Sequence, residues 1–129
     1  MDGNRLLELA REARLKSYSP YSGYSVGAAL LTKSGKVYTG CNIENATFSP
    51  TICAERTAFA KAISEGEREF EAIAIVGGRE DAGSPCYPCG VCRQFMSEFC
   101  AGGFRLYFAN GEDIAEYSLD EIMPHRFSL

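Results

Sequence analysis

The residues best suited to chemistry are three cysteines and one glutamate in two short motifs. Cys53 and Glu55 stand two positions apart, and Cys89 and Cys92 form a C-x-x-C pair further along the chain. Catalytic zinc sites typically use three protein ligands and leave a fourth position for water, and thiolates are soft ligands that suit zinc. A C-x-x-C pair at a helix start can direct both sulfurs toward one ion. The spacing therefore predicts a metal site that Cys53 completes, with a carboxylate close by.

Hydrophobic periodicity places each motif at the start of a predicted helix. One apolar pattern of helical period covers about residues 53–65, and a second helix begins at Cys89 and carries Val91, Phe95 and Phe99 on one face. Each helix follows a predicted strand and packs back across the sheet. We therefore expect both helix N-termini at the same end of the sheet, where their cysteines can meet.

The other predicted elements complete one α/β domain over residues 1–129. A first helix precedes a hairpin, and a short last helix begins with a capping box formed by Ser118 and Glu121. The predicted strands cover residues 24–32, 37–40, 71–77 and 104–109. This order indicates a mixed sheet with helices packed on its faces.

Composition and charge exclude several classes of partner. The net charge is -4, the sequence pI is about 5.0, and the basic residues are scattered, so a polynucleotide ligand is not expected. No apolar run has membrane-spanning length, and the N-terminal residues are unlike a signal peptide. We therefore expect a cytoplasmic protein with a small-molecule ligand and no membrane partner. In a reducing compartment its six cysteines would be free, metal-bound or catalytic.

Five ordered blocks resemble the small homotetrameric cytidine deaminases. They are YSPYS at residues 18–22, VGAAL at 26–30, GCNIEN at 40–45, CAERTA at 53–58 and PCGVCRQ at 88–94. The resemblance implies a three-layer α/β/α sandwich with a mixed central sheet of about five strands. It also implies hydrolytic conversion of cytidine and deoxycytidine to uridine and deoxyuridine, with release of ammonia in pyrimidine salvage. Active sites in such homotetramers lie at subunit interfaces.

The same resemblance assigns roles to individual residues. One zinc ion per subunit would be bound by Cys53, Cys89 and Cys92, with Glu55 moving protons. Asn42 and Glu44 would contact the ribose, and Tyr24 would contact the pyrimidine or the sugar. The carbonyl of Ala54 would contact the departing amine. Phe127 would reach in from a neighbouring subunit and contact the base.

Charge balance suggests a role for Arg56. Three thiolates around a divalent ion leave a formal charge of about -1, which opposes ionisation of a bound water. Helix N-termini carry partial positive charge, and Arg56 can donate charge-assisted hydrogen bonds to a thiolate. We therefore expect Arg56 beside the metal ligands, where it keeps the ion acidic.

Alternative readings centre on Cys86, which forms an overlapping P-C-x-x-C with Cys89. Cys86 could be a fourth ligand that closes a structural zinc site without catalysis. The run through Cys92 could also hold an iron–sulfur cluster, although Cys100 is badly spaced as the fourth ligand. A separate alternative is a deaminase of a modified nucleoside such as blasticidin S, because such enzymes share the zinc-binding motifs.

Three residues outside the metal-ligand motifs also carry expectations. Cys41 and Cys100 are predicted to be buried as small hydrophobic side chains. Ile43 is predicted to face the core, with its polar neighbours facing a cleft.

Overall fold

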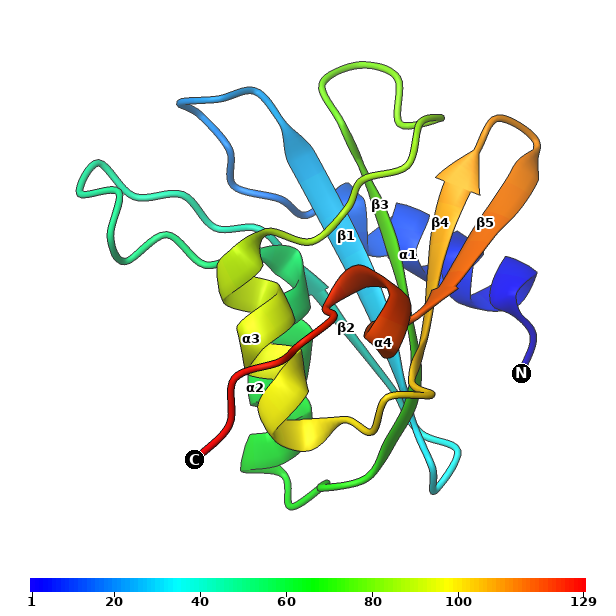
Figure 1. Cartoon of the computed structure of the whole chain (residues 1–129). Helices are drawn as coiled ribbons and strands as arrows, with labels where there is room; N and C mark the ends of the chain where they lie inside the picture. The colour runs from blue at the N-terminus through cyan, green and yellow to red at the C-terminus, as the bar shows by residue number, and fades with distance from the viewer.

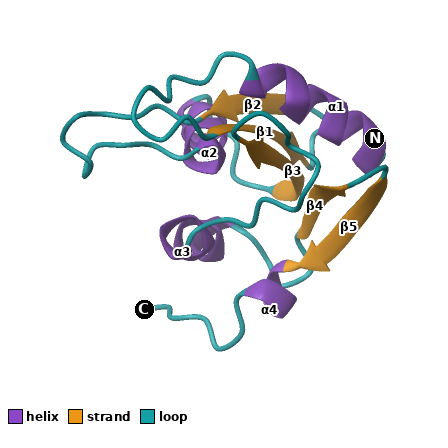
Figure 2. Cartoon of the chain, turned by 90° about the horizontal axis from the view of Figure 1, so that it is seen from above, coloured by secondary structure: helices purple, strands orange, loops and turns teal.

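The computed structural model describes all 129 residues as a five-stranded mixed sheet with helices on both faces (Figure 1). The elements in chain order are α1 (Gly3–Arg14), β1 (Ser25–Thr32), β2 (Val37–Cys41), α2 (Ala54–Ser64), β3 (Phe70–Gly78), α3 (Gly90–Phe99), β4 (Arg105–Asn110), β5 (Asp113–Ser118) and α4 (Leu119–Ile122). Seen from above, α1 covers one face of the sheet, whereas α2 and α3 cover the other (Figure 2). The expected three-layer α/β/α sandwich is confirmed.

Strand β1 illustrates how the sheet builds a core on each side. Successive strand residues point to opposite faces. Ala28 and Leu30 belong to the larger core beneath α2 and α3, whereas Ala29 and Leu31 belong to the smaller core beneath α1. All four side chains are buried. The central strands are therefore apolar on both faces and fix the helices that lie on them.

The strand order brings the N-termini of α2 and α3 to the same end of the sheet. The order is β2-β1-β3-β4-β5, and both β2 and β3 run antiparallel to β1. These two strands therefore run in the same direction, and each is followed by a helix on the same face. The predicted meeting of the two helix starts is confirmed.

Close packing sets the position of α2 against the sheet. A Cβ atom on Gly40 of β2 would lie 2.6 Å from the carbonyl oxygen of Ala54 and 2.6 Å from the amide nitrogen of Ala58. Only a glycine at this position allows the first turn of α2 to approach the strand backbone. On the other side, the rings of Phe59 on α2 and Phe95 on α3 pack with their centroids 5.9 Å apart.

Several details differ from the sequence-based expectations. The strand β5 was not located individually, although about five strands were expected. Cys100 is buried as predicted, but Cys41 is only half-buried, in a groove between α1 and α2. Ile43 does not face the core: it is 41% exposed, because its backbone pairs with Ile52 in the loop before α2.

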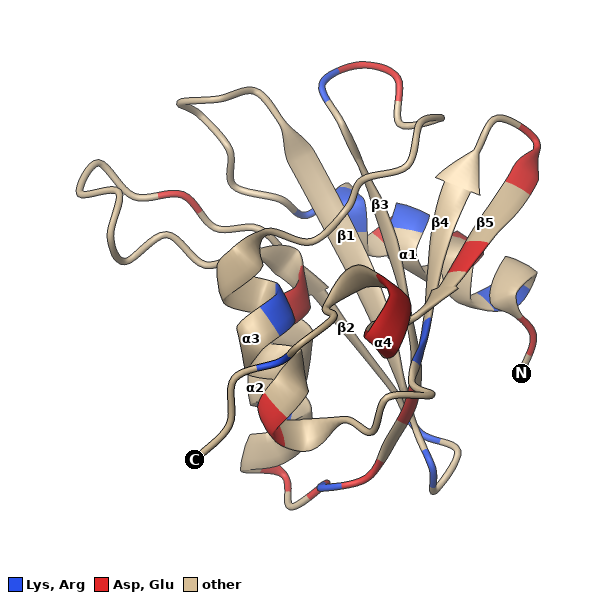
Figure 3. Ribbon diagram, in the orientation of Figure 1, with Lys and Arg blue, Asp and Glu red and all other residues tan.

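The end of the chain follows its predicted local chemistry. The Ser118 hydroxyl accepts a hydrogen bond from the Glu121 amide at 3.3 Å, and the Glu121 carboxylate accepts one from the Ser118 amide at 2.8 Å. This is the expected capping box of α4. Basic residues are dispersed over several elements, without a continuous stripe (Figure 3). None of the helices combines the length and apolar character needed to cross a membrane.

Candidate metal centre and catalytic cavity

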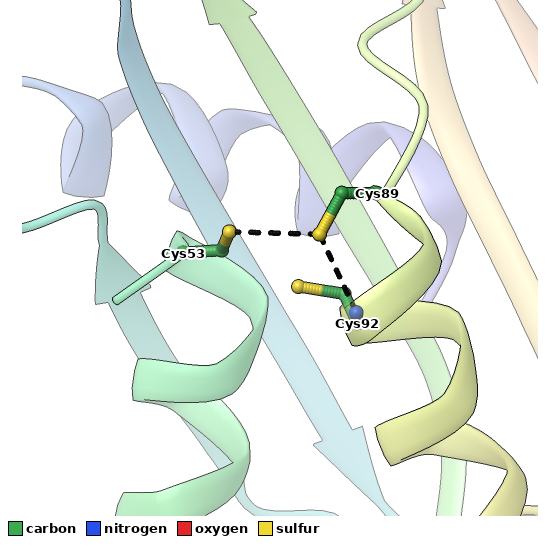
Figure 4. A group of neighbouring side chains, drawn as sticks. All are labelled: Cys53, Cys89 and Cys92. Carbon is green, nitrogen blue, oxygen red and sulfur yellow. Dashed lines mark hydrogen bonds between the residues drawn. The ribbon is translucent and has the colours of Figure 1, made fainter. Parts of the chain in front are cut away.

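Three cysteine sulfurs converge where α2 and α3 begin (Figure 4). Cys53 is the N-cap residue of α2, Cys89 is the N-cap residue of α3, and the buried Cys92 lies in the first turn of α3. Their Sγ atoms all lie within 4.8 Å of one another, and those of Cys53 and Cys89 are 3.8 Å apart. Tetrahedral ligands at a zinc–sulfur distance of about 2.3 Å are separated by roughly 3.8 Å. The spacing therefore fits one zinc ion.

The acid–base behaviour of these thiols also fits a metal site. Hydrogen bonds, first from Cys92 and then from Arg56 and Cys89, lower the pKa of Cys53 to about 5. The pKa of Cys92 is raised, first by its hydrogen bond to Cys53 and then by burial. The cluster thus readily accommodates one thiolate and resists a second. A divalent cation would supply the positive charge that three thiolates need.

The guanidinium of Arg56 lies beside this cluster. Its Nη2 atom donates to the Sγ atom of Cys53 at 3.5 Å and to the Thr51 carbonyl at 3.4 Å. Its Nε atom is buried without a hydrogen-bond partner. The pKa of Arg56 is raised, first by the hydrogen bond to Cys53 and also by one to Cys92. A buried donor facing sulfur is best satisfied by a negatively charged thiolate, as metal binding would provide.

Glu55 is the acidic residue buried next to the sulfurs. It lies in the first turn of α2 and is only 4% exposed. Burial, followed by the negative charge of Cys53, raises the pKa of its carboxyl group to about 7. A carboxyl group that titrates near neutral pH can accept a proton in one step and return it in the next.

A cavity of about 210 Å³ joins two of the three predicted metal ligands, Cys53 and Cys89, to most of the predicted binding residues, whereas Cys92 does not line it. Its lining includes six residues predicted from sequence, namely Tyr24, Asn42, Cys53, Ala54, Glu55 and Cys89. It also includes five that were not predicted as site residues, namely Val26, Thr51, Ile52, Cys86 and Tyr87. Thr51 and Ile52 directly precede Cys53, and Cys86 and Tyr87 closely precede Cys89. Proximity to the ligand motifs was therefore the signal that could have identified four of them.

The Asn42 side chain helps to build the cavity as well as lining it. Its amide nitrogen donates to the Tyr24 carbonyl at 2.8 Å, and its oxygen accepts from the Val26 amide at 2.9 Å and from the Ser17 hydroxyl. Asn42 is buried and ties the start of β1 to the end of β2. The amide nitrogen carries two hydrogens, so one N–H remains for a ligand.

Glu44 lies in an adjoining cavity of about 370 Å³, not in the catalytic cavity itself. Its carboxylate accepts hydrogen bonds from the Tyr21 amide at 2.9 Å, the Ser22 amide at 3.1 Å and the Ser22 hydroxyl. The hydrogen bonds from Ser22 lower the pKa of Glu44, so the group is ionised at neutral pH. Thr51 lines both cavities. An ionised acceptor therefore lies next to the mouth of the catalytic cavity.

The backbone of Ala54 differs from its expected role. Its carbonyl was expected to receive the departing amine, but this oxygen lies against Gly40 of β2. The reason is that helical carbonyls point along the helix toward its C-terminus. The backbone N–H of Ala54 is the first of α2 and has no hydrogen-bond partner within the helix. This N–H group, and not the carbonyl, therefore remains available to bind a ligand.

One predicted residue, Phe127, and the cysteine of the alternative metal sites, Cys86, lie apart from the sulfur cluster. Phe127 is 65% exposed, does not line the cavity of its own chain, and accepts a hydrogen bond from Gln94 through its carbonyl at 3.2 Å. Cys86 lines the cavity but is not a member of the three-sulfur group. The closed four-cysteine site and the iron–sulfur run are therefore not formed.

These features define the class of protein. It is a zinc-dependent enzyme, in which an α/β sandwich brings three thiols and a buried carboxyl group together. The family model of the cytidine and deoxycytidylate deaminase zinc-binding region matches residues 2–107. A cytidine deaminase of Sporosarcina psychrophila is 47% identical over 129 residues, covering 99% of this chain and 93% of that protein. The chain belongs to the cytidine and deoxycytidylate deaminase family, and the expected resemblance and zinc cofactor are thereby confirmed.

Two further relatives place the chain within this family. The crystal structure of a cytidine deaminase from Burkholderia pseudomallei is similar with a TM-score of 0.89 and 43% identity, covering 98% of this chain and 100% of that chain. A blasticidin-S deaminase of Bacillus cereus is 30% identical over 128 residues, covering 95% of this chain and 90% of that protein. The higher identities belong to the relatives named as cytidine deaminases.

Proposed function

We propose that this protein hydrolyses cytidine and deoxycytidine to uridine and deoxyuridine with release of ammonia, as an enzyme of pyrimidine salvage. The observation that carries the proposal is the buried carboxyl group of Glu55 next to three converging thiols, two of which line the same small cavity. The higher identity to cytidine deaminases than to a blasticidin-S deaminase favours an unmodified nucleoside. We assign the whole activity to residues 1–129 as a single domain.

In this mechanism Glu55 moves the protons. Zinc bound by Cys53, Cys89 and Cys92 would polarise the attacking water. Glu55 accepts one proton from that water and delivers it to N3 of the pyrimidine, while the water oxygen adds to C4. It then takes the second proton from the new hydroxyl group on C4 and gives it to the amino group, so that the C4–N bond breaks, ammonia leaves and the C4 carbonyl forms. A carboxyl pKa of about 7 supports both directions of transfer.

Neighbouring groups position the substrate and adjust the charge of the site. Arg56 and the two helix N-termini offset the negative charge of the thiolates. The Ala54 amide donates to the pyrimidine carbonyl oxygen, because it is a free first-turn donor at the cavity. Asn42 donates its remaining N–H to the ribose 3'-hydroxyl, and Glu44 accepts from that hydroxyl at the cavity mouth.

We further propose that the protein works as a cytoplasmic homotetramer with its active sites at subunit interfaces. Apolar side chains are exposed in the adjoining cavity (Phe48), on α3 (Val91) and in the segment after α4 (Phe127). Exposed aromatic residues beside a binding cavity are typical of interaction surfaces. Phe127 would reach the cavity of a neighbouring subunit and stack on the base. All six cysteines are free, as expected in a reducing cytoplasm.

The test is the loss of the cytosine absorbance band when the zinc-loaded protein is mixed with cytidine. The proposal expects turnover that disappears after chelator treatment and in the Glu55→Gln variant. Zinc analysis of that variant provides the control, because the metal should be retained. Absence of turnover with both cytidine and deoxycytidine, despite bound zinc, would contradict the proposal and favour a modified pyrimidine nucleoside.

A further inference from the structure

Cys86 is a thiol of the catalytic cavity that the three-sulfur group does not include. It lies on the loop between β3 and α3, three residues before Cys89. Burial is the first cause of the raised pKa of its thiol, so the side chain is uncharged at neutral pH. Cys86 therefore acts on the cavity through the space that its side chain occupies. It contributes no charge and is not one of the metal ligands.

The sulfur of Cys86 lies against the backbone of Gly77. A Cβ atom on Gly77 of β3 would lie 2.6 Å from this sulfur, 3.1 Å from Cε1 of Tyr24 and 3.0 Å from Cγ2 of Val26. The thiol, the aromatic ring and the valine methyl group thus gather over the bare backbone of Gly77. Close-packed interiors resist changes of even one methylene group.

The next residue anchors the loop from the outside. The ring of Tyr87 packs on Phe108 with centroids 5.0 Å apart and on Tyr117 with centroids 5.9 Å apart. The hydroxyl groups of Tyr87 and Tyr117 are 3.5 Å apart. The loop is therefore attached to β4 and β5 immediately after Cys86, which keeps the thiol in place.

The orientation of the pyrimidine ring determines which ring atom lies next to the Cys86 thiol. This orientation rests on the proposed function. C4 must lie at the metal, N3 must face Glu55 of α2, and N1 with its sugar must point toward Asn42. C5 adjoins C4 on the ring edge opposite N3. The loop that carries Cys86 lines the same cavity as Cys53 and Glu55, and its thiol is close enough for the charges of both groups to act on it.

We propose that Cys86 is a specificity-determining residue that limits the size of the substituent at C5 of the pyrimidine. Gly77 and Tyr24 pack against Cys86 and hold its side chain in place. Removal of the sulfur opens space of about one methyl group next to C5. One methylene group in an apolar pocket typically changes discrimination by about 10-fold or more. The substrates that report on this contact are cytidine and 5-methylcytidine.

The measurement is the ratio of kcat/KM for 5-methylcytidine to kcat/KM for cytidine. We expect Cys86→Ala to raise this ratio by about 10-fold and Cys86→Val to lower it by a similar factor. The electronic effect of the methyl group on C4 is the same in every variant. A change in the ratio therefore measures the contact between the residue at position 86 and the methyl group at C5. A purely structural role would change both substrates alike and leave the ratio constant.

Two matched variants serve as controls. Cys41→Ala makes the same change at a half-buried thiol outside the cavity and should leave the ratio and the turnover of cytidine unchanged. Cys86→Ser nearly preserves the size of the side chain, so it should keep both the ratio and the bound zinc.

The outcomes separate this inference from the proposed function. A ratio that stays constant in both Cys86→Ala and Cys86→Val, while cytidine is still turned over, overturns the inference alone. Loss of zinc from Cys86→Ser also overturns it, because Cys86 would then be a metal ligand. Failure of the unmodified protein to deaminate cytidine overturns the proposed function, and the assignment of C5 with it.

Discussion

The metal end and the sugar end of the cavity are built in different ways. At the metal end, Cys53, Cys89 and Glu55 come from two helix N-termini that pack on the sheet, and Glu55 is almost fully buried. At the sugar end, Glu44 is half-buried in a loop and Phe48 is 75% exposed. The metal end is therefore built from packed helix starts, whereas the sugar end is built from partly exposed loops.

This difference separates the groups proposed for chemistry from those proposed for binding. Helices fixed by core packing hold their side chains in one geometry, as preorganised catalytic groups require. The carboxylate of Glu44 is instead held by hydrogen bonds that the Tyr21 and Ser22 amides donate from the loop between α1 and β1. Changes at the metal end should therefore have larger effects than equivalent changes at the sugar end.

The largest effect is expected for Glu55→Gln at the metal end. The amide is close in size to the carboxyl group but cannot accept the water proton, so kcat should fall by about 10³-fold or more. Turnover of cytidine followed by absorbance measures the loss, and metal analysis should find unchanged zinc. Residual turnover within about 10-fold of the unmodified protein would show that another group carries the proton.

Zinc removal is expected to destabilise the same end of the molecule. A metal that binds only the folded chain stabilises it by about 4 kcal/mol when its free concentration is 1,000 times its Kd. Chemical denaturation with and without a chelator measures this difference. The Cys92→Ala variant should lack most of the zinc-dependent gain, and a gain equal to that of the unmodified protein would contradict the three-ligand assignment.

The metal end could be predicted from sequence because its signals are local. Cys53 and Cys89 immediately precede helices with apolar periodicity, and the alternation of strands and helices predicts that both helix starts lie at the same end of the sheet. The sandwich, the family and zinc were all predicted and are confirmed. The roles of the individual site residues stay predictions.

The sugar end and the sheet edge could not be predicted to the same degree, because they depend on contacts between distant segments. The exposure of Ile43 follows from its pairing with Ile52 and Tyr18, which no short pattern reveals. The separation of Cys86 from the sulfur cluster depends on its contact with Gly77. Strand β5 lies at an edge and is mostly half-exposed, so its hydrophobic alternation is weak.

The burial of Glu55 should also make metal-free stability depend on pH. Its pKa is about 7 in the folded chain against 4.5 for an unperturbed group. A raised pKa contributes stability that is fully present below the unfolded value and is lost as pH rises through the folded value. The loss amounts to about 3 kcal/mol between these values.

The Glu55→Gln variant isolates this contribution, because its side chain does not titrate. Denaturation of both chelator-treated proteins should show that the variant gains about 3 kcal/mol relative to the unmodified chain between roughly pH 4 and pH 8. The other titrating groups are common to both proteins, so they largely cancel in the difference. A difference that does not change with pH would mean that the Glu55 carboxyl group is not destabilised by burial.

The smallest effect is expected for Glu44→Gln, which makes the same chemical change at the sugar end. The amide is a weaker acceptor for the ribose hydroxyl, so kcat/KM for cytidine should fall by about 10-fold, mainly through KM. With 3'-deoxycytidine, which lacks that hydroxyl, the variant and the unmodified protein should differ little. An equal loss with both nucleosides would instead assign Glu44 to shaping the Tyr21–Ser22 loop, and the sugar end would then depend on loop structure more than on direct recognition.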